Sequence, residues 1–260
     1  MTAAFGVDRA DLKARLRRGD ATFGTFLGAA SAVTAEVCAG AGADWVLLDL
    51  EHGSGGEEQA RDVVPAAASY GVPTIVRAES TERVRAGRLL DLGALGVMFP
   101  RIDTSQDAAQ ALRHLRYPPH GDRGVATYNR MCRFGLDRQA LHRANDEIIG
   151  VVQIETLGAL QSVAEIAELD GVDILFVGPL DLSYALGVPG DLTAPVFTDA
   201  LDRVLDAARR AGKAAGYLVP DGTAAGRMAE DGWQFLAIGS DTTVLAAAVA
   251  NHMSTARGTA

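Results

Sequence analysis

The feature that most constrains this chain is an alternation of short apolar runs with amphipathic segments, repeated eight times. Buried strands are predicted at 22–27, from Trp45 onwards, and at 74–77, 96–100, 148–154, 173–177, 214–219 and 235–238. Helices are predicted after each strand, at 31–41, 57–70, 81–92, 105–115, 157–169, 195–211, 222–230 and 242–252. Strands that alternate with helices in this way pair in parallel through right-handed crossovers.

Eight such units predict an α/β fold of the (β/α)8 TIM-barrel type, which commonly has this length. An open doubly wound sheet is the alternative, but the turn at 28–31, Gly-Ala-Ala-Ser, lacks its G-x-G-x-x-G pattern. No linker or change of composition divides the chain, so we expect residues 1–260 to form a single domain. A short helix at 8–18, with Asp8 as N-cap, is expected first, and loops are expected at 116–145 and 178–194.

The composition disfavours several classes of function. A formal net charge of -9 disfavours a nucleic-acid partner, and charged residues interrupt every long apolar stretch. The N-terminal residues lack the apolar core of a secretory signal. Cys38 and Cys132 have neither metal-binding nor disulfide spacing, so both are expected to be reduced thiols. We therefore expect a cytoplasmic protein that acts on small molecules, without a nucleic-acid or membrane partner.

Polar side chains gather where the predicted strands end. In a TIM barrel the carboxyl ends of the strands form the active-site face, so these groups are predicted to meet there. They are Asp49, Glu51 and His52 after the second strand, Arg77 after the third, Arg101 after the fourth, Gln153 and Glu155 at the fifth, Asp181 after the sixth, and Ser240 and Asp241 after the eighth.

Glu155 and Asp181 follow adjacent strands and form a candidate metal site. Two carboxylates without a nearby cysteine favour a hard divalent cation, Mg²⁺ or Mn²⁺. The alternative is that both acids cap helices or form salt bridges. Glutamate is a poor N-cap, whereas the Pro-x-Asp-Leu-Ser sequence around Asp181 is a good one.

His52 is the candidate base, because imidazole titrates near neutrality and a neighbouring carboxylate, Asp49 or Asp91, can orient it. Arg77 ends a buried run and needs an anionic partner: Glu51, Asp49 or a substrate oxygen. The other histidines, at positions 114, 120, 142 and 252, are interpreted as surface residues.

These segments resemble the HpcH/HpaI family of class II pyruvate aldolases, which belongs to the superfamily of phosphoenolpyruvate- and pyruvate-binding TIM barrels. The resemblance rests on Leu-Asp-Leu-Glu-His-Gly at 48–53, Ile-Val-Arg at 75–77, Leu-Leu-Asp-Leu-Gly-Ala at 89–94, Gly-Asp-Arg-Gly at 121–124, Val-Gln-Ile-Glu-Thr at 152–156 and Phe-Val-Gly-Pro-Leu-Asp-Leu-Ser at 176–183. The motifs occur in the family's order and span positions 24 to 241.

The resemblance implies a divalent metal, Mg²⁺ or Mn²⁺ or else Co²⁺, on Glu155 and Asp181. It implies that His52 is the base, that Arg77 stabilises the enolate or carbonyl oxygen, and that Asp91 raises the basicity of the histidine. Gln153 and the backbone at Leu180 and Asp181 would hold the pyruvate moiety. The implied assembly is a homohexamer, a trimer of dimers.

Two positions depart from the family pattern. Ala78 stands where many relatives have proline, which affects local rigidity. The segment 126–132, Ala-Thr-Tyr-Asn-Arg-Met-Cys, replaces a run of small residues and bears on the choice of acceptor. Arg123 and Arg130 of this loop region suit a carboxylated or polyhydroxylated aldehyde, or are simply exposed to solvent.

The predicted function is a metal-dependent aldolase that cleaves or forms 4-hydroxy-2-oxoacids, from pyruvate and an aldehyde, through a metal-stabilised pyruvate enolate. A Schiff-base aldolase is disfavoured because Lys13 and Lys213 do not follow predicted strands. The alternatives are a citryl- or malyl-CoA-type lyase, another enolate-based carbon–carbon lyase or synthase, and a non-catalytic 2-oxoacid-binding protein.

Overall fold

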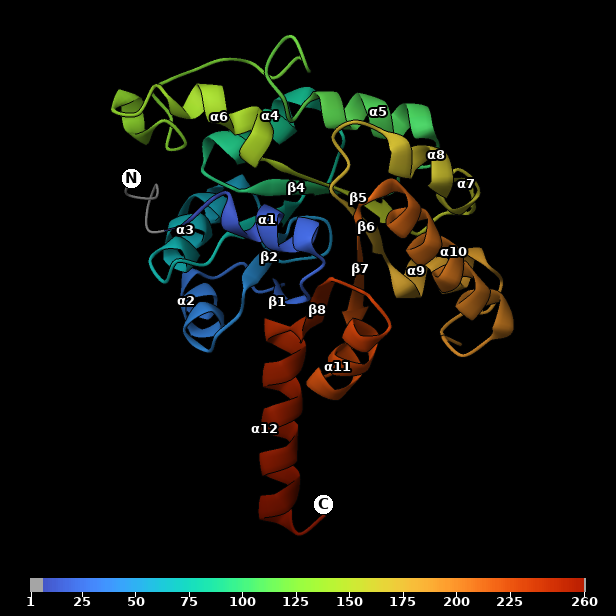
Figure 1. Ribbon diagram of the computed structural model, residues 1–260. Coiled ribbons are helices and arrows are strands. Elements are labelled where there is room, and N and C mark those ends of the chain that lie inside the picture. Colours follow the sequence, from blue (N-terminus) through green and yellow to red (C-terminus); the bar gives the residue numbers. More distant parts are fainter. Residues whose placement is uncertain (1–6, 260) are drawn as a thin grey trace.

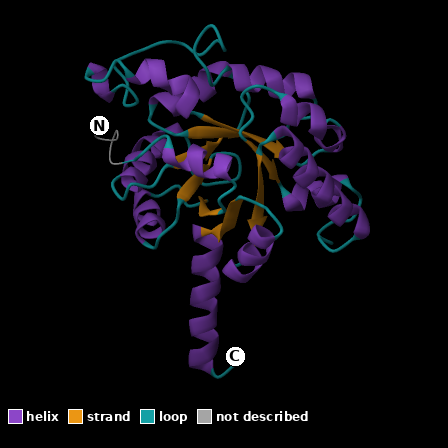
Figure 2. Ribbon diagram, viewed as in Figure 1, coloured by secondary structure: helices purple, strands orange, loops and turns teal. Residues whose placement is uncertain are grey.

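Eight parallel strands close into a barrel in chain order, with helices around the outside (Figures 1 and 2). The computed structural model describes residues 7–259. The strands are β1 Thr22–Leu27, β2 Trp45–Asp49, β3 Thr74–Arg77, β4 Gly96–Phe99, β5 Ile149–Ile154, β6 Ile174–Val177, β7 Ala214–Val219 and β8 Phe235–Ser240. The predicted TIM barrel is confirmed.

The helices are α1 Asp11–Arg18, α2 Ala32–Gly40, α3 Glu57–Ala68, α4 Arg83–Asp91, α5 Ser105–Arg113, α6 Ala140–Glu147, α7 Leu157–Gln161, α8 Val163–Glu168, α9 Pro179–Ala185, α10 Pro195–Ala211, α11 Gly222–Glu230 and α12 Asp241–Arg257. None of the helices formed by residues 7–259 has the length and apolar character needed to cross a membrane.

Both predicted loops contain helices. In the first, α6 spans Ala140–Glu147 and buries only small residues, Ala140 and Ala144. In the second, α9 is a short helix that begins at Pro179, where a proline fits because the first helical N–H needs no partner. The helix predicted at 157–169 is two helices, because Ser162 between them leaves the helical conformation.

The first helix also begins later than predicted. Asp8 is not its N-cap, since α1 starts at Asp11 and Ala10 occupies the capping position. The Asp8 carboxylate instead accepts the N–H of Ala10 at 3.1 Å, just before the helix begins.

The helix α1 closes one end of the barrel. Its Leu12 and Leu16 belong to the same apolar cluster as the side chains inside the barrel. Lys13 of the same helix is buried and donates to the Ile148 carbonyl at 2.6 Å, beside the start of β5. The amino ends of the strands are therefore covered, and the carboxyl ends are left for a functional site.

Inside the barrel, aromatic rings fill the space between the strands. The ring of Trp45 stacks on Phe235 with centroids 3.7 Å apart. Trp45 also lies against the backbone of Gly24, where an added Cβ would come within 2.3 Å of the indole. A glycine in β1 is therefore required by the width of the indole ring.

This contact predicts that Gly24→Ala destabilises the fold by about 1–3 kcal/mol, the usual cost of overpacking a filled core. Gly87→Ala is the matched control, because Gly87 lies inside α4 and an added Cβ meets nothing within 4 Å. We expect the control to stabilise by about 0.5–1 kcal/mol through helix propensity. Urea unfolding measures both, and equal effects of the two changes would contradict this account.

Candidate active site

A buried ion pair joins the ends of β2 and β3. Asp49 and Arg77 lie opposite each other in register. Arg77 donates from Nε to Oδ1 of Asp49 at 2.8 Å and from Nη2 to Oδ2 at 2.7 Å. Burial would raise the pKa of Asp49, but the hydrogen bonds and charge of Arg77 outweigh burial, and this pKa lies below its usual value. Of the three partners that the sequence allowed for Arg77, Asp49 is the one with bidentate geometry.

Asp49 also shapes the loop that carries His52. Its Oδ1 accepts the backbone N–H groups of Glu51 at 3.1 Å and of His52 at 3.2 Å. The loop curls so tightly that a Cβ on Gly53 would lie 2.1 Å from the Asp49 carbonyl oxygen. The His52 ring is mostly exposed, with Nε2 at 3.9 Å from Glu51 Oε2. The same Glu51 oxygen lies 3.2 Å from Arg77 Nη1, as an ionic contact without hydrogen-bond geometry.

Glu155 is buried beside these residues at the end of β5. Its Oε1 accepts the backbone N–H of Arg101 at 2.7 Å, and its Oε2 accepts from Nε2 of Gln153. Burial raises the pKa of Glu155 above its usual value, and the negative charges of Glu51 and Asp181 raise it further. Oε1 of Gln153 is buried without a hydrogen-bond partner among the described residues.

Asp181 approaches this group from the first turn of α9. The N-cap of α9 is Gly178 and that of α7 is Thr156, so neither Asp181 nor Glu155 is a capping residue. The ionic contact of Asp181 is with Nη1 of Arg101, at 4.0 Å. Leu180 is exposed in the same turn, and its carbonyl accepts the Ser183 hydroxyl.

The donor set suits a hard divalent cation. Within residues 7–259 no three His, Cys, Asp or Glu side chains converge as a metal-binding group, so protein ligands alone do not complete a shell. The negative charge of Asp181 nevertheless disfavours the charged form of Glu155, and Gln153 leaves a buried oxygen without a donor. A cation would relieve both, with water and substrate completing the shell. A Cβ on Gly178 would lie 2.7 Å from Oε2 of Glu155, so the missing side chain keeps this space open.

The backbone N–H of Arg101 holds the Glu155 carboxylate, a contact that the sequence did not indicate. The sequence places Arg101 among the strand-end residues but gives it no part in the metal site. Its φ of 55° is a left-handed conformation, which costs an arginine about 1–2 kcal/mol. Its position directly after β4 could have indicated that Arg101 lies at the site. Nothing in the sequence indicated its backbone hydrogen bond to Glu155 or its unusual φ.

Asp91 lies away from His52 within the single chain. It ends α4, which returns from the carboxyl end of β3 to the start of β4, so it sits toward the amino ends of the strands. Its carboxylate accepts from Nη2 of Arg123 at 2.7 Å. The structure thus brings His52 and Arg77 together at one end of the barrel and Asp91 near the other.

Two interpretations of surface residues are wrong. The Arg123 side chain is fully buried, with its guanidinium over the Tyr117 ring, so it is not exposed to solvent. His114 is also buried, and its Nδ1 lies 2.7 Å from Oδ1 of Asp122. The acidic partner of His114 is eight residues away, across an irregular turn that has no sequence periodicity.

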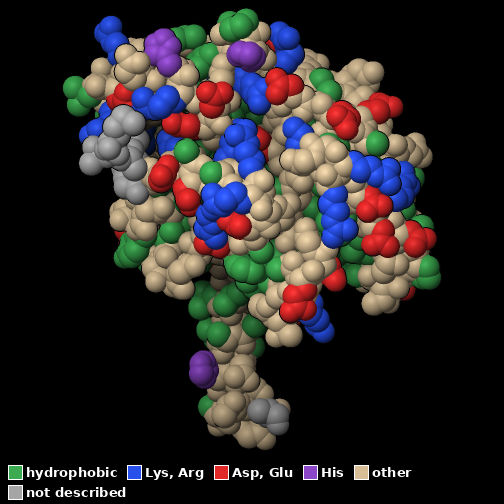
Figure 3. Space-filling model, in the orientation of Figure 1, with side chains coloured by type: hydrophobic (Ala, Val, Ile, Leu, Met, Phe, Trp, Pro, Cys, Tyr) green, Lys and Arg blue, Asp and Glu red, His purple; other side chains and the backbone are tan. Residues whose placement is uncertain are grey.

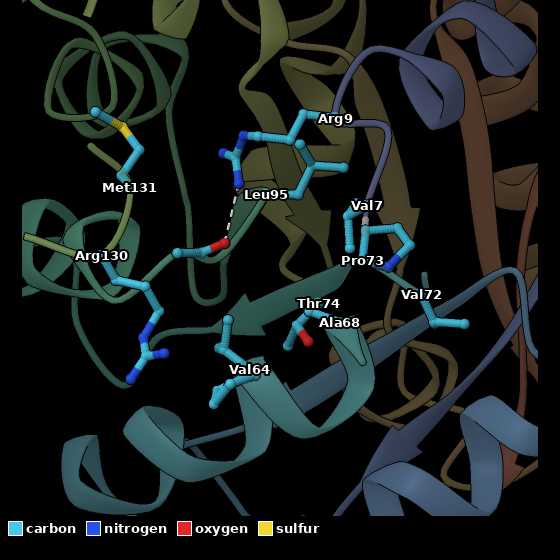
Figure 4. A pocket seen from close by; sticks show the side chains of 12 residues that line it. Val7, Arg9, Val64, Ala68, Val72, Pro73, Thr74, Leu95, Arg130 and Met131 are labelled. Carbon is cyan, nitrogen blue, oxygen red and sulfur yellow. Dashed lines mark hydrogen bonds between the residues drawn. The ribbon is translucent and has the colours of Figure 1, made fainter. Parts of the chain in front are cut away.

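A small pocket of about 20 Å³ lies near the other end of the barrel (Figure 4). Its walls include Thr74 at the start of β3 and Leu95 just before β4. Arg9 crosses it and donates to the carbonyl oxygens of Gly93 and Ala94. Because His52, Arg77, Glu155 and Asp181 lie at the opposite ends of the strands, this pocket is separate from the candidate site.

A TIM barrel with carboxylates, an arginine and a histidine at the carboxyl ends of its strands defines a class of enzymes that act on small molecules. The chain belongs to the HpcH/HpaI aldolase/citrate lyase family, whose model matches residues 22–248. The members that resemble it in sequence are named as aldolases, which are carbon–carbon lyases.

The relatives match nearly the whole chain. A 4-hydroxy-2-oxo-heptane-1,7-dioate aldolase from Salmonella dublin is 38% identical over 235 residues, 90% of this chain and 89% of that protein. A hydroxypyruvate/pyruvate aldolase from Paraburkholderia phytofirmans is 39% identical over 236 residues, 88% of this chain and 91% of that protein. The crystal structure of a family member from Burkholderia cenocepacia J2315 has a TM-score of 0.90 and 36% identity, covering 95% of this chain and 99% of that one.

The buried pair predicts a pH-dependent loss of stability in Asp49→Asn. This change leaves Arg77 without its bidentate partner, so we expect a loss of about 3–5 kcal/mol at pH 7. Because the folded-state pKa of Asp49 is lowered, its contribution is complete above the unfolded-state value of about 3.9 and disappears as pH falls through the folded-state value. Denaturant unfolding between pH 7 and pH 3 should therefore show the two proteins converging.

The control is Asp62→Asn on the exposed face of α3, for which we expect a change within about 0.5 kcal/mol. A gap between wild type and Asp49→Asn that stays constant down to pH 3 would argue against the pair as its cause.

Proposed function

We propose that this chain is a divalent-metal-dependent aldolase that cleaves or forms 4-hydroxy-2-oxoacids from pyruvate and an aldehyde. The observation that carries the proposal is the convergence of Glu155 and Asp181 at the carboxyl ends of the strands, where the backbone N–H of Arg101 bonds to Glu155 and its guanidinium lies 4.0 Å from Asp181. The names of the relatives, a 4-hydroxy-2-oxo-heptane-1,7-dioate aldolase and a hydroxypyruvate/pyruvate aldolase, support the same reaction class.

Each residue has a proposed part in the reaction. Glu155 and Asp181 would hold Mg²⁺ or Mn²⁺, and the cation would supply Lewis-acid stabilisation of charge on the 2-oxoacid. Gln153 and the backbone at Leu180 and Asp181 would orient the pyruvate moiety. Arg77, fixed by Asp49, places a positive charge where the C2 oxygen becomes negative. His52 removes the proton from the C4 hydroxyl in cleavage, a contribution of about 10²–10⁴-fold.

The lysines support a mechanism without a Schiff base. Lys13 lies in α1 at the closed end of the barrel, paired with Asp173. Lys213 immediately precedes β7, so it also lies at the amino end of a strand. Neither amine is near the carboxylate cluster. A citryl- or malyl-CoA-type lyase is less well supported, because Arg123, one of the arginines available for CoA phosphates, is buried against Asp91.

The test is proton exchange at the methyl group of pyruvate in D₂O, followed by NMR. We expect exchange with Mg²⁺ or Mn²⁺ and its loss on chelation with EDTA. Glu155→Gln should lower Mn²⁺ affinity, measured by calorimetry, by at least the roughly 10–100-fold typical of losing an outer-shell partner. Glu230→Gln on the exposed end of α11 is the control. Absence of exchange with every divalent metal would reject the aldolase and direct attention to acyl-CoA substrates.

Assembly is proposed from the C-terminal helix. The helix α12 extends away from the barrel and none of its side chains is buried (Figures 1 and 3). It exposes Val244, Leu245, Val249 and Met253. Helices in globular proteins are stable chiefly through packing of an apolar face, so we propose that a second copy of the chain covers α12. This contact would be one interface of the expected trimer of dimers.

Assembly would also reconcile Asp91 with its expected role. Asp91 lies toward the end of the barrel opposite His52, so it can act on a histidine only in another copy. Mixing His52→Ala with Asp91→Ala subunits, after dissociation and reassembly, should then restore cleavage at about a quarter of the sites. Mixing His52→Ala with Arg77→Ala is the control, because both belong to one subunit's site and a mixture would lack this form of rescue. Equal activity in both mixtures would contradict the shared site.

A further inference from the structure

The backbone of Arg101 fixes where its side chain begins. The N–H of Arg101 donates to Oε1 of Glu155 at 2.7 Å, directly after β4. Its φ of 55° is unusual for a residue with a Cβ. Left-handed backbone at non-glycine residues is concentrated at functional sites, because only a specific contact outweighs its cost. Here that contact ties Arg101 to a proposed metal ligand.

The guanidinium of Arg101 is a cation without a strong partner. The side chain is 67% exposed, and its ionic contact is with Asp181 at 4.0 Å. None of the hydrogen bonds among the described residues involves this guanidinium, whereas that of Arg77 is held by two bonds to Asp49. Asp181 engaged with a divalent cation would offer still less compensation for the arginine.

The arginines suggested by the sequence are less suited to bind an anion in their own subunit's site. Arg123 is fully buried on Asp91, toward the closed end of the barrel. Arg130 lines the pocket near the amino ends of the strands, with its guanidinium facing the Phe134 ring at 5.8 Å. Arg101 is the exposed arginine that the structure places against the carboxylate cluster itself.

We propose that Arg101 is the specificity-determining residue that selects acceptor aldehydes bearing a carboxylate. The inference rests on the proposed aldolase function and names the class of its second substrate. Pyruvate would occupy the position beside Gln153 and Arg77, so the exposed guanidinium is left for the far end of the acceptor. A planar guanidinium binds a carboxylate through two parallel hydrogen bonds, which a neutral aldehyde cannot form.

The test compares two four-carbon acceptors, 4-oxobutanoate and butanal, in the addition of pyruvate with Mn²⁺. We expect wild type to favour the carboxylated aldehyde in kcat/KM, and Arg101→Gln to lower that preference by about 10–100-fold, the usual range for a charge-assisted hydrogen bond. Arg101→Lys should recover part of the preference because it keeps the charge without the fork. Arg61→Gln, an exposed arginine on α3, should leave the preference unchanged.

The outcomes separate this inference from the function on which it rests. Absence of proton exchange at the pyruvate methyl group in the wild-type protein rejects the proposed function, and the inference with it. Normal exchange in wild type, with equal use of both aldehydes or an unchanged preference in Arg101→Gln, rejects the inference alone. A parallel fall for both aldehydes together with weaker Mn²⁺ binding also rejects it, since Arg101 would then only position Glu155 and Asp181.

Discussion

The buried ion pair between Asp49 and Arg77 is the interaction on which the candidate site depends. Removing two charges from water is costly, and the cost is recovered only when geometry is good and the remaining hydrogen-bonding positions are filled. Both conditions hold, because the strand register sets the two side chains face to face. The same Asp49 carboxylate then fixes the backbone of the loop bearing Glu51 and His52. One pair thus determines where the fixed cation and the proposed base lie.

The two ends of the barrel differ for a simple reason. Leu12 and Leu16 of α1 cover the amino ends of the strands and extend the apolar interior. At the other end the side chains of His52 and Arg101 are exposed, that of Asp181 is partly exposed, and polar groups accumulate. Burial there is deep enough to raise the pKa of Glu51 and Glu155, and the clustering of acids increases the effect. That is the electrostatic setting in which a bound cation is most favourable.

Much of the fold was predictable because its signals are local. Strands buried on both faces are continuous apolar runs, and the predicted bounds of β1, β3 and β7 agree with the structure. The meeting of Glu155, Asp181, His52 and Arg77 at one end of the barrel also followed, since parallel strands carry their carboxyl ends to one face. The catalytic roles of these residues stay predictions.

What the sequence could not decide depends on tertiary geometry. Asp49 and Glu51 were equal candidates for Arg77, and only the strand register separates them. Asp181 has a good capping sequence, yet Gly178 takes the N-cap position because the helix begins earlier. The burial of His114 with Asp122 depends on a turn without periodicity. The left-handed φ of Arg101 cannot be predicted from its residue type, because arginine rarely adopts that conformation.

The projecting helix α12 has a thermodynamic consequence. It buries no side chain against its own barrel, so in an isolated chain it adds little to the cooperative unfolding unit. With α12 covered by a second copy, the folded form would be a product of association, and its midpoint of thermal unfolding would rise with protein concentration. The free energy of unfolding of such a barrel would then depend on protein concentration as well as on the sequence, and dilution would favour the unfolded state.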